Sequence, residues 1–407
     1  MRNFPFRLDR RSLLRWGAAS GTALLPLARA RATPATGTRV GRYVQLGRTG
    51  MEVSDISFGA SRLRSGDEAL VNHALDCGIN YFDTADSYTG GESERVLGNA
   101  MQGQRDRIYV VSKTQAGSGD DKHDMMRALE GSLRRLQTDY LDVYFNHAVN
   151  DVARLQNTDW YEFADLAKEQ GKIRYTGISG HGGNLAECLD YAIDHDAVDV
   201  ILVAHNFGQD PAFYEKLTRS WDLIAKQPRL PQLLAKAKTR DIGVVAMKTL
   251  MGARLNDMRP YERGPTTFAQ AAMRWTLANP DVDALIISMT STQLINEYLG
   301  ASGAAELADG DLPILQHYAN LNGQNYCRHG CNDCAEACPY GVPIADVLRT
   351  RMYATDYQDV DFARREYAQL ESNADACIGC SGDPCRSACS HGLPIADLCA
   401  PTHRMLS

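Results

Sequence analysis

Short β-rich runs alternate with longer amphipathic stretches from about residue 40 to residue 300. Eight runs are rich in β-branched and aromatic residues and have the length of buried strands: 55–59, 80–85, 108–114, 140–148, 173–179, 199–206, 242–250 and 284–290. Apolar residues recur at three-and-four spacing in the intervening stretches, among them 67–78, 125–137, 160–171 and 184–196. This spacing is typical of amphipathic helices, so the pattern predicts consecutive strand–helix units.

Eight strand–helix units within ~250 residues describe a (β/α)8 barrel, which places the chain in the α/β class. A hairpin at 43–54 precedes the first strand and is a candidate plug for the barrel floor. The competing architecture, a doubly wound sheet, usually carries a glycine-rich dinucleotide loop after its first strand. Residues 58–66 read FGASRLRSG and contain no G-x-G-x-x-G motif. A barrel is therefore the expected fold of residues 40–305.

The chain changes character after a glycine- and alanine-rich joint at 300–311. Nine of the eleven cysteines lie between Cys327 and Cys399, where the motif AC-x-x-G-x-PIAD occurs twice, 51 residues apart. Each copy carries a quartet, spaced C-x3-C-x2-C-x3-C-P in the first and C-x2-C-x4-C-x3-C in the second. The quartets are Cys327, Cys331, Cys334 and Cys338, then Cys377, Cys380, Cys385 and Cys389.

Both spacings are close variants of the bacterial ferredoxin run C-x2-C-x2-C-x3-C-P, whose fourth cysteine serves the other cluster. A zinc site usually uses two pairs of ligands and does not account for two quartets, and disulfides would leave the cysteines more evenly scattered. The sequence therefore predicts two [4Fe–4S] clusters in a domain at 312–407. Because 344–372 is helix-like, this domain resembles the α-helical dicluster ferredoxins. Their crossed pattern would add Cys389 to the first three cysteines and Cys338 to the second group, a pairing that the altered spacings leave open.

Four residues that can carry chemistry follow three consecutive predicted strands: Asp83, Tyr88, Lys113 and His147. Chemistry in such barrels resides at the carboxyl ends of the strands, so the four are expected to meet. A nearby ammonium lowers the pKa of a tyrosine, and we expect Lys113 to activate Tyr88 in this way while Asp83 pins the lysine. His147 would bind a substrate carbonyl. Tyr88 would protonate its oxygen as hydride reaches the carbon, which is general acid catalysis.

The barrel region resembles the aldo-keto reductases over about residues 40 to 300, in the segments YFDTADSYTGGESERVLG, VVSKT, LDVYFNHA, KIRYTGISGH and GVVAMKTLMG. The resemblance assigns the family's catalytic tetrad to the four residues above and implies NAD(P)H bound across the barrel mouth without a Rossmann loop. The cofactor contacts that it implies are Ser179, Lys248, Leu250, Gly252, Ser288, Gln293, Asn296 and Glu297. Family members that use NADPH tend to have a cation after the eighth strand. Residues 288–297 contain none, so NAD and NADP both stay open.

The N-terminus has the order of a secretory signal: an arginine pair at 10–11, a weakly apolar stretch at 16–28, and small residues that allow cleavage after Ala30 or Ala32. The apolar stretch is shorter than the ~20 residues of a membrane span. The arginine pair resembles the twin-arginine signal, which exports proteins that fold first. Iron–sulfur clusters assemble in the cytoplasm and need a folded cage. We therefore expect 1–32 to be a twin-arginine leader and the mature protein to be periplasmic.

The net charge of −7 argues against a nucleic-acid partner, because phosphate binding requires a basic surface. We expect an exported NAD(P)-dependent oxidoreductase that reduces a small carbonyl compound or oxidises an alcohol. Its clusters would be structural or would exchange electrons with a partner protein. The alternative is a non-catalytic nucleotide-binding or partner-docking barrel tethered to an electron-transfer ferredoxin. The complete set of four catalytic residues favours the enzyme.

Overall fold

The computed structural model describes residues 38–210, 229–251, 258–262 and 266–407. The predicted leader and the predicted cofactor contact Gly252 lie outside these residues. The barrel and the C-terminal helices belong to one compact unit.

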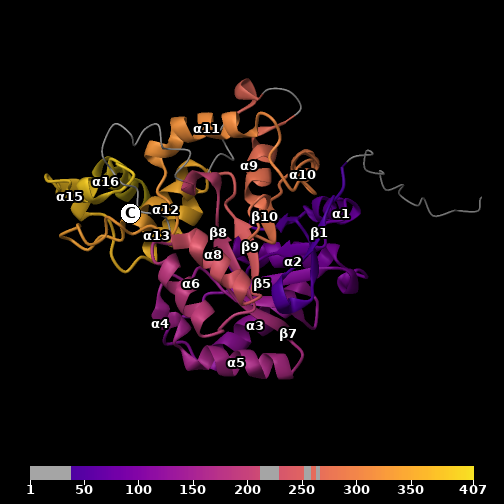
Figure 1. Ribbon diagram of the computed structural model, residues 1–407. Helices are drawn as coiled ribbons and strands as arrows, with labels where there is room; N and C mark the ends of the chain where they lie inside the picture. The colour runs from indigo at the N-terminus through magenta and orange to yellow at the C-terminus, as the bar shows by residue number, and fades with distance from the viewer. Residues whose placement is uncertain (1–37, 211–228, 252–257, 263–265) are drawn as a thin grey trace, which may run out of the picture. The chain divides into compact units, whose positions relative to one another are not determined.

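Eight parallel strands close into a barrel in the order β10-β3-β4-β5-β6-β7-β8-β9 (Figure 1). Each predicted run forms one of them: β3 (Ile56–Gly59), β4 (Tyr81–Asp83), β5 (Tyr109–Thr114), β6 (Leu141–Asn146), β7 (Ile173–Gly180), β8 (Val200–Ala204), β9 (Gly243–Met247) and β10 (Ala284–Ser288). Nearly every residue of these strands is buried, which is why they appear in the sequence as almost continuous hydrophobic runs. The predicted (β/α)8 barrel is confirmed.

A hairpin closes the barrel at the amino ends of the strands. Its strands, which pair antiparallel, are β1 (Tyr43–Gln45) and β2 (Glu52–Ser54). Leu46, Met51 and Val53 are buried in one cluster with the inward-facing side chains of the barrel. The backbone N–H of Arg48 donates to the carbonyl oxygen of Asp241 at 2.6 Å, shortly before β9 begins. The hairpin therefore fills the barrel floor and leaves the opposite end open.

Helices form most of the connections between strands: α1 (Glu68–Asp76), α2 (Glu92–Ala100), α3 (Lys122–Leu136), α4 (Val152–Leu155), α5 (Thr158–Glu169), α6 (Leu185–Asp194), α8 (Arg229–Thr239), α9 (Phe268–Leu277) and α10 (Thr292–Leu299). Helix α3 shows how the sequence sets their bounds. The carboxylate of Asp121 accepts hydrogen bonds from the backbone N–H groups of His123 and Asp124 and so caps the helix. Its apolar face, which includes Leu129 and Leu136, is fully buried.

The C-terminal region is mostly helical, as predicted, with α11 (Asp311–Asn322), α12 (Ile344–Thr355), α13 (Val360–Ala368), α14 (Ala376–Gly379), α15 (Pro384–Ala388) and α16 (Ile395–Leu406). The repeat in its sequence is also a repeat in its structure. Gly341 and Gly392 both have φ of +62°, a left-handed conformation that favours glycine. Helices α12 and α16 then begin directly after Pro343 and Pro394, which share nearly the same backbone angles.

Polar contacts attach this helical region to the open end of the barrel. Arg62, which follows β3, forms an ion pair with Asp359 at 3.1 Å, immediately before α13. Asn150, which follows β6, donates a hydrogen bond from Nδ2 to Asp346 of α12 at 2.9 Å. Helices α12 and α13 therefore lie against the loops at the carboxyl ends of the strands.

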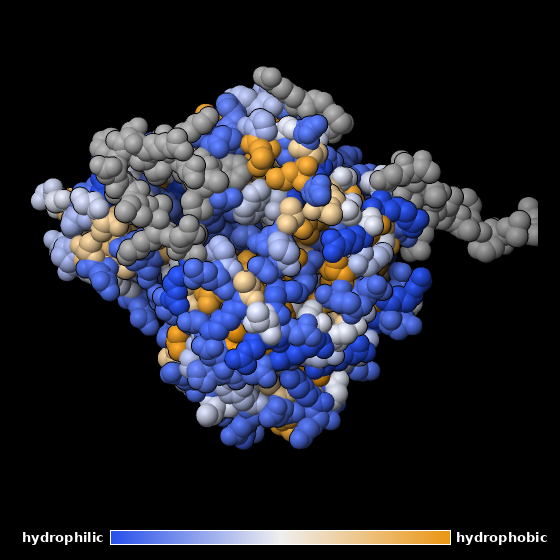
Figure 2. Space-filling view, viewed as in Figure 1, coloured by the Kyte–Doolittle hydropathy of each residue, from blue (hydrophilic) through white to orange (hydrophobic). Residues whose placement is uncertain are grey.

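The face of the molecule seen in Figure 2 is mostly hydrophilic, with hydrophobic residues scattered among the polar ones. Within the described ranges, no helix is both long and apolar enough to cross a membrane.

Candidate active site

Three of the four predicted catalytic residues stand at the carboxyl ends of adjacent strands. Asp83 ends β4, Lys113 lies in β5, and His147 directly follows β6. These strands are parallel neighbours, so their carboxyl ends meet on one side of the barrel. Tyr88 reaches the same place from the segment that follows β4. The four side chains line one cavity, and their catalytic roles remain predictions.

Asp83 and Lys113 form a buried ion pair. The ammonium Nζ of Lys113 donates to Oδ1 of Asp83 at 2.6 Å and to the carbonyl oxygen of Thr84 at 2.6 Å. The two side chains are only 2% and 1% exposed. Burial raises the pKa of Asp83 and lowers the pKa of Lys113, while the attraction between the two charges opposes both shifts. A charge buried this deeply requires its partner, so the pair fixes the position of the ammonium.

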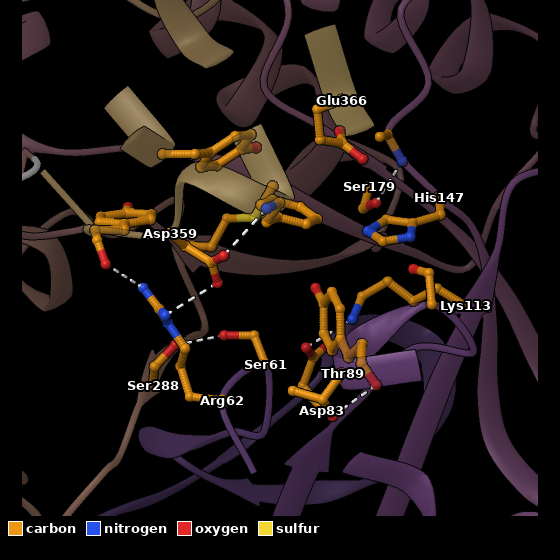
Figure 3. Close-up of a pocket in the computed structure, with 18 of the residues that line it drawn as sticks. Ser61, Arg62, Asp83, Thr89, Lys113, His147, Ser179, Ser288, Asp359 and Glu366 are labelled. Atoms are coloured by element: carbon orange, nitrogen blue, oxygen red, sulfur yellow. Dashed lines mark hydrogen bonds and ion pairs between the residues drawn. The ribbon is translucent and has the colours of Figure 1, made fainter. Parts of the chain in front are cut away.

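A tight turn presents Tyr88 to the other catalytic residues. The next three residues, Thr89–Gly91, all have positive φ, which the two glycines adopt without strain. The Lys113 ammonium lies 4.9 Å from the centre of the Tyr88 ring. The Tyr88 and His147 rings are 5.6 Å apart and inclined at 80°. Figure 3 shows Asp83, Lys113 and His147 pointing toward the cavity from their three strand ends.

The structure corrects the expectation that Lys113 lowers the pKa of Tyr88. Burial raises this pKa well above its ordinary value, and the negative charge of Asp83 acts in the same direction. The ammonium lies over the face of the ring and is already paired with Asp83, so it does not offset these two effects. Tyr88 is therefore a neutral phenol at physiological pH and has a proton to give.

His147 is held neutral. Burial lowers its pKa well below the ordinary value, and the positive charge of Lys113 acts in the same direction. Its backbone N–H donates to the carbonyl oxygen of Thr114 at 2.8 Å, which fixes the residue against β5. The ring atom Nδ1 is buried and has no hydrogen-bond partner among the described residues. A neutral imidazole with an unsatisfied nitrogen can bind a polar ligand atom.

We expect that titration of Tyr88 will not lower the kcat/KM of carbonyl reduction between about pH 6 and pH 9. A proton donor works below its own pKa, and the pKa of Tyr88 is raised above its ordinary value of about 10. Alcohol oxidation needs the deprotonated form of Tyr88, so its kcat/KM should instead rise with pH. Profiles of kcat/KM against pH in both directions measure this. A falling limb of reduction near neutral pH that disappears in Tyr88→Phe would contradict the assignment.

A cavity of about 530 Å³ includes the four residues and extends across the barrel mouth. Four of the eight cofactor contacts implied by the sequence line it: Ser179, Lys248, Leu250 and Ser288. Three others, Gln293, Asn296 and Glu297, lie on α10 and do not line it. The amide Oδ1 of Asn296 lies 2.9 Å from Nε2 of His73 on α1, so this side chain is engaged elsewhere.

The barrel side of the cavity fits a nicotinamide nucleotide chemically. Lys248 supplies a cation, and Ser179 and Ser288 supply hydroxyl groups. The ring atoms Nδ1 of His147 and His181 are buried without a partner in the described part of the chain. Because buried polar atoms are nearly always hydrogen-bonded, these nitrogens are available to a bound ligand.

The C-terminal region completes the cavity, which the sequence alone did not predict. It contributes seven lining residues from α12, α13 and their connection: Tyr353, Tyr357, Asp359, Asp361, Phe362, Arg365 and Glu366. Two contacts hold this wall in place. Arg62 donates to the carbonyl oxygen of Tyr357 at 2.6 Å, and the Lys248 ammonium lies 4.7 Å from the ring centre of Tyr353. Hydrophobic periodicity predicts helices at 344–372, but it contains no signal for where distant helices pack.

The first predicted cluster set consists of Cys327, Cys331, Cys334 and Cys389. These side chains lie in one neighbourhood of the C-terminal region, which Cys385 and Cys399 share. Burial raises the pKa of Cys334 to about 12, so it is a protonated thiol unless a cation binds nearby.

The second predicted set consists of Cys338, Cys377, Cys380 and Cys385. Cys377 is hydrogen-bonded to the thiol of Cys399, which lies outside both quartets, and Cys385 lies near Cys334. All eleven cysteines are free thiols. Within the described ranges, no three His, Cys, Asp or Glu side chains are arranged to hold a metal ion as they stand. Cluster ligation therefore remains a prediction.

Comparisons with known proteins agree with the fold. Residues 55–319, more than half of the chain, match the model of the aldo/keto reductase family, so the protein belongs to this family. The match ends before the first cysteine quartet.

Among curated relatives, L-galactose dehydrogenase of Arabidopsis thaliana is 26% identical, over 63% of this chain and 86% of that protein. Methylglyoxal reductase YeaE of Escherichia coli is 28% identical, over 62% and 84%. An aldo/keto reductase from Klebsiella pneumoniae, solved in complex with NADP and acetate, is 25% identical. The alignment covers 72% of this chain and all of that one, with a TM-score of 0.54.

Proposed function

We propose that the protein reduces the carbonyl group of a small molecule, or oxidises the corresponding alcohol, with NAD(P) as the hydride carrier. The observation that carries this proposal is the buried Asp83–Lys113 pair beside Tyr88 and His147 in one cavity. The names of the dehydrogenase and reductase relatives, and the NADP held by the Klebsiella enzyme, support it.

Bound nicotinamide would supply or accept the hydride. Residues of this chain would position the substrate, transfer the proton and bind the nucleotide. The neutral His147 would hydrogen-bond the carbonyl oxygen and hold it beside Tyr88. The Tyr88 hydroxyl would give its proton to that oxygen. The Lys113 ammonium, fixed over the ring, would then stabilise the negative charge that appears on the phenolate. Ser179, Lys248 and Ser288 would hold the nucleotide.

Assays with NADPH and with NADH, each against a panel of aldehydes and ketones, test this function. We expect the nucleotide to be oxidised in step with formation of the alcohol, and comparison of the two nucleotides determines the cofactor preference. Tight nucleotide binding without turnover of any substrate would contradict the proposed enzymatic function and support a non-catalytic nucleotide-binding barrel.

We further propose that the two cysteine quartets ligate two [4Fe–4S] clusters. The two quartets stand in a repeated backbone frame, and Cys327 lies in the same neighbourhood as Cys331, Cys334 and Cys389. Both observations support this proposal. Their spacing suits iron–sulfur ligation better than zinc. The clusters would stabilise the fold of this region, because metal ligation contributes to folding, and they would suit an electron-transfer partner protein.

Replacing Cys334 with serine should remove one cluster. Iron in protein purified without oxygen should fall from about eight to about four atoms per chain, because each cluster holds four. Cys188→Ser, which alters a buried cysteine of the barrel, is the matched control and should keep the full iron content. Iron analysis by mass spectrometry measures both. One zinc atom and no iron in the wild-type protein would overturn the cluster proposal.

We propose that the protein reaches the periplasm folded, by the twin-arginine route. The arginine pair at 10–11 ahead of an apolar stretch supports this. Replacing both arginines with lysine should leave the folded, iron-bearing protein in the cytoplasm, whereas Arg7→Lys should not change its location. Cell fractionation followed by immunoblotting measures the distribution. A double-lysine protein that still accumulates in the periplasm would contradict the route.

A further inference from the structure

The loop at 327–331, which begins and ends with cysteines of the first quartet, is docked on the barrel. The imidazole of His329 donates from Nδ1 to the carbonyl oxygen of His181 at 2.7 Å. The backbone N–H of Gly330 donates to the carbonyl oxygen of Gly182 at 3.1 Å. His181 and Gly182 directly follow β7, so this loop contacts the carboxyl end of a barrel strand.

Segment 181–184 and the C-terminal region are packed closely. A Cβ atom at Gly183 would lie 2.8 Å from Oδ1 of Asn332 and 3.1 Å from Cβ of Ala345 on α12. The side-chain amide of Asn332 also donates from Nδ2 to Oδ1 of Asn184 at 2.7 Å. The C-terminal region therefore contacts this segment along its whole length.

Segment 181–184 continues directly into the candidate active site. His181 lines the active-site cavity, two residues after Ser179. The hydroxyl oxygen of Ser179 accepts a hydrogen bond from the backbone N–H of Ala148 at 2.9 Å, and Ala148 directly follows His147. Figure 3 shows Ser179 and His147 on the same side of the cavity. A shift of the segment would therefore move a proposed nucleotide contact and the histidine beside Tyr88.

His329 is held in one orientation between the quartet and the cavity. Because a carbonyl oxygen only accepts, Nδ1 of His329 carries the proton of the bond to His181. The two imidazole rings lie with their centres 6.3 Å apart and their planes inclined at 76°. Both rings and Cys327 also line one small cavity of about 20 Å³. The first quartet thus begins directly behind a residue of the active-site cavity.

We propose that His329 is a positioning residue of the active site and that it couples the first cysteine quartet to the nucleotide site. The loop is fixed when Cys327 and Cys331 hold their cluster, and the loop in turn fixes segment 181–184 and Ser179. Each site then strengthens binding at the other, because coupling between two binding sites is reciprocal. The inference rests on the proposed function and on the proposed clusters, and it adds a physical link between them.

Fluorescence titration of the full chain, purified without oxygen, tests the positioning role with NADPH and with NADH. His329→Ala should raise the Kd of the tighter-binding nucleotide by about 5- to 30-fold, because the carbonyl oxygen of His181 loses its donor. His329→Asn, whose Nδ2 can take the place of the imidazole Nδ1, should return the Kd to within about 3-fold of wild type. His403→Ala is the matched control. It removes a 2.8 Å hydrogen bond to Tyr367 within the C-terminal region and should leave the Kd unchanged.

Two cysteine variants test the coupling by the same titration. Cys334→Ser, which alters the first predicted cluster set, should raise the Kd of the nucleotide by about 5-fold or more. Cys380→Ser, which alters the second set, is the matched control and should change this Kd by less than about 3-fold. An unchanged Kd in Cys334→Ser, or an equal rise in both cysteine variants, would overturn the coupling.

Urea denaturation of the histidine variants separates positioning from a general loss of stability. His329→Ala and His403→Ala each remove one hydrogen bond and should lose comparable stability, whereas only His329→Ala should weaken nucleotide binding. Equal nucleotide affinity in wild type and His329→Ala, or a loss that His329→Asn does not restore, would overturn the positioning role. A wild-type protein that binds neither nucleotide would show that the proposed function is wrong, and the coupling with it.

Discussion

Replacing Tyr88 with phenylalanine should lower turnover by about 10²- to 10⁴-fold, the usual contribution of a positioned general acid. The substitution removes the phenol proton and keeps the ring that lies under the Lys113 ammonium and against the imidazole of His147. The cavity and the proposed nucleotide contacts should stay in place. The loss should therefore appear in kcat rather than in nucleotide affinity, measured by steady-state kinetics together with fluorescence titration of NADPH.

Tyr140→Phe is the matched control for this experiment. Tyr140 lies just before β6, at the end of the barrel opposite the cavity, and packs against the guanidinium of Arg105. Loss of its hydroxyl group should leave turnover unchanged. Turnover close to wild type in Tyr88→Phe would show that another group donates the proton.

The buried ion pair gives the largest expected effect on stability. Asp83→Leu leaves the ammonium of Lys113 buried without its partner, which should lower the free energy of unfolding by about 3–5 kcal/mol. Adding Lys113→Met removes the stranded charge. Since an apolar pair of similar volume is often as stable as a buried ion pair, the double variant should recover most of the loss while remaining inactive.

Urea denaturation followed by circular dichroism measures all three proteins. Recovery of stability without recovery of activity separates the role of the pair in the fold from its role in the site. A single variant as stable as wild type would mean that Lys113 does not depend on Asp83, and the electrostatic account of the site would fail.

The barrel could be predicted from the sequence because its strands are buried on both faces and leave uninterrupted apolar runs. The position of each catalytic residue follows from the same pattern. Once β4, β5 and β6 are located, Asp83, Lys113 and His147 must meet at their carboxyl ends. Local sequence also marks Tyr88, since a turn that requires positive φ places two glycines shortly after it.

Features that depend on distant packing could not be predicted. Glu366 lies on a helix whose pattern shows an apolar face but not what that face meets. The pKa of Tyr88 depends on how deeply the ring is buried, which the sequence does not reveal, so the expected direction of its shift was wrong. Asn296 follows the last strand at a plausible distance for a cofactor contact, yet its side chain reaches His73 of α1 rather than the cavity.

Transfer of deuterium from a nicotinamide cofactor tests the central claim most directly. NADPH and NADH carrying deuterium at both C4 positions would each be mixed with the protein and a panel of small aldehydes, and the alcohol product analysed by mass spectrometry and NMR. Hydride transfer predicts one deuterium atom on the former carbonyl carbon of each alcohol molecule, and almost none on the same timescale with Tyr88→Phe. Alcohol that forms without deuterium, or nucleotide that stays unoxidised with every aldehyde, would contradict the account.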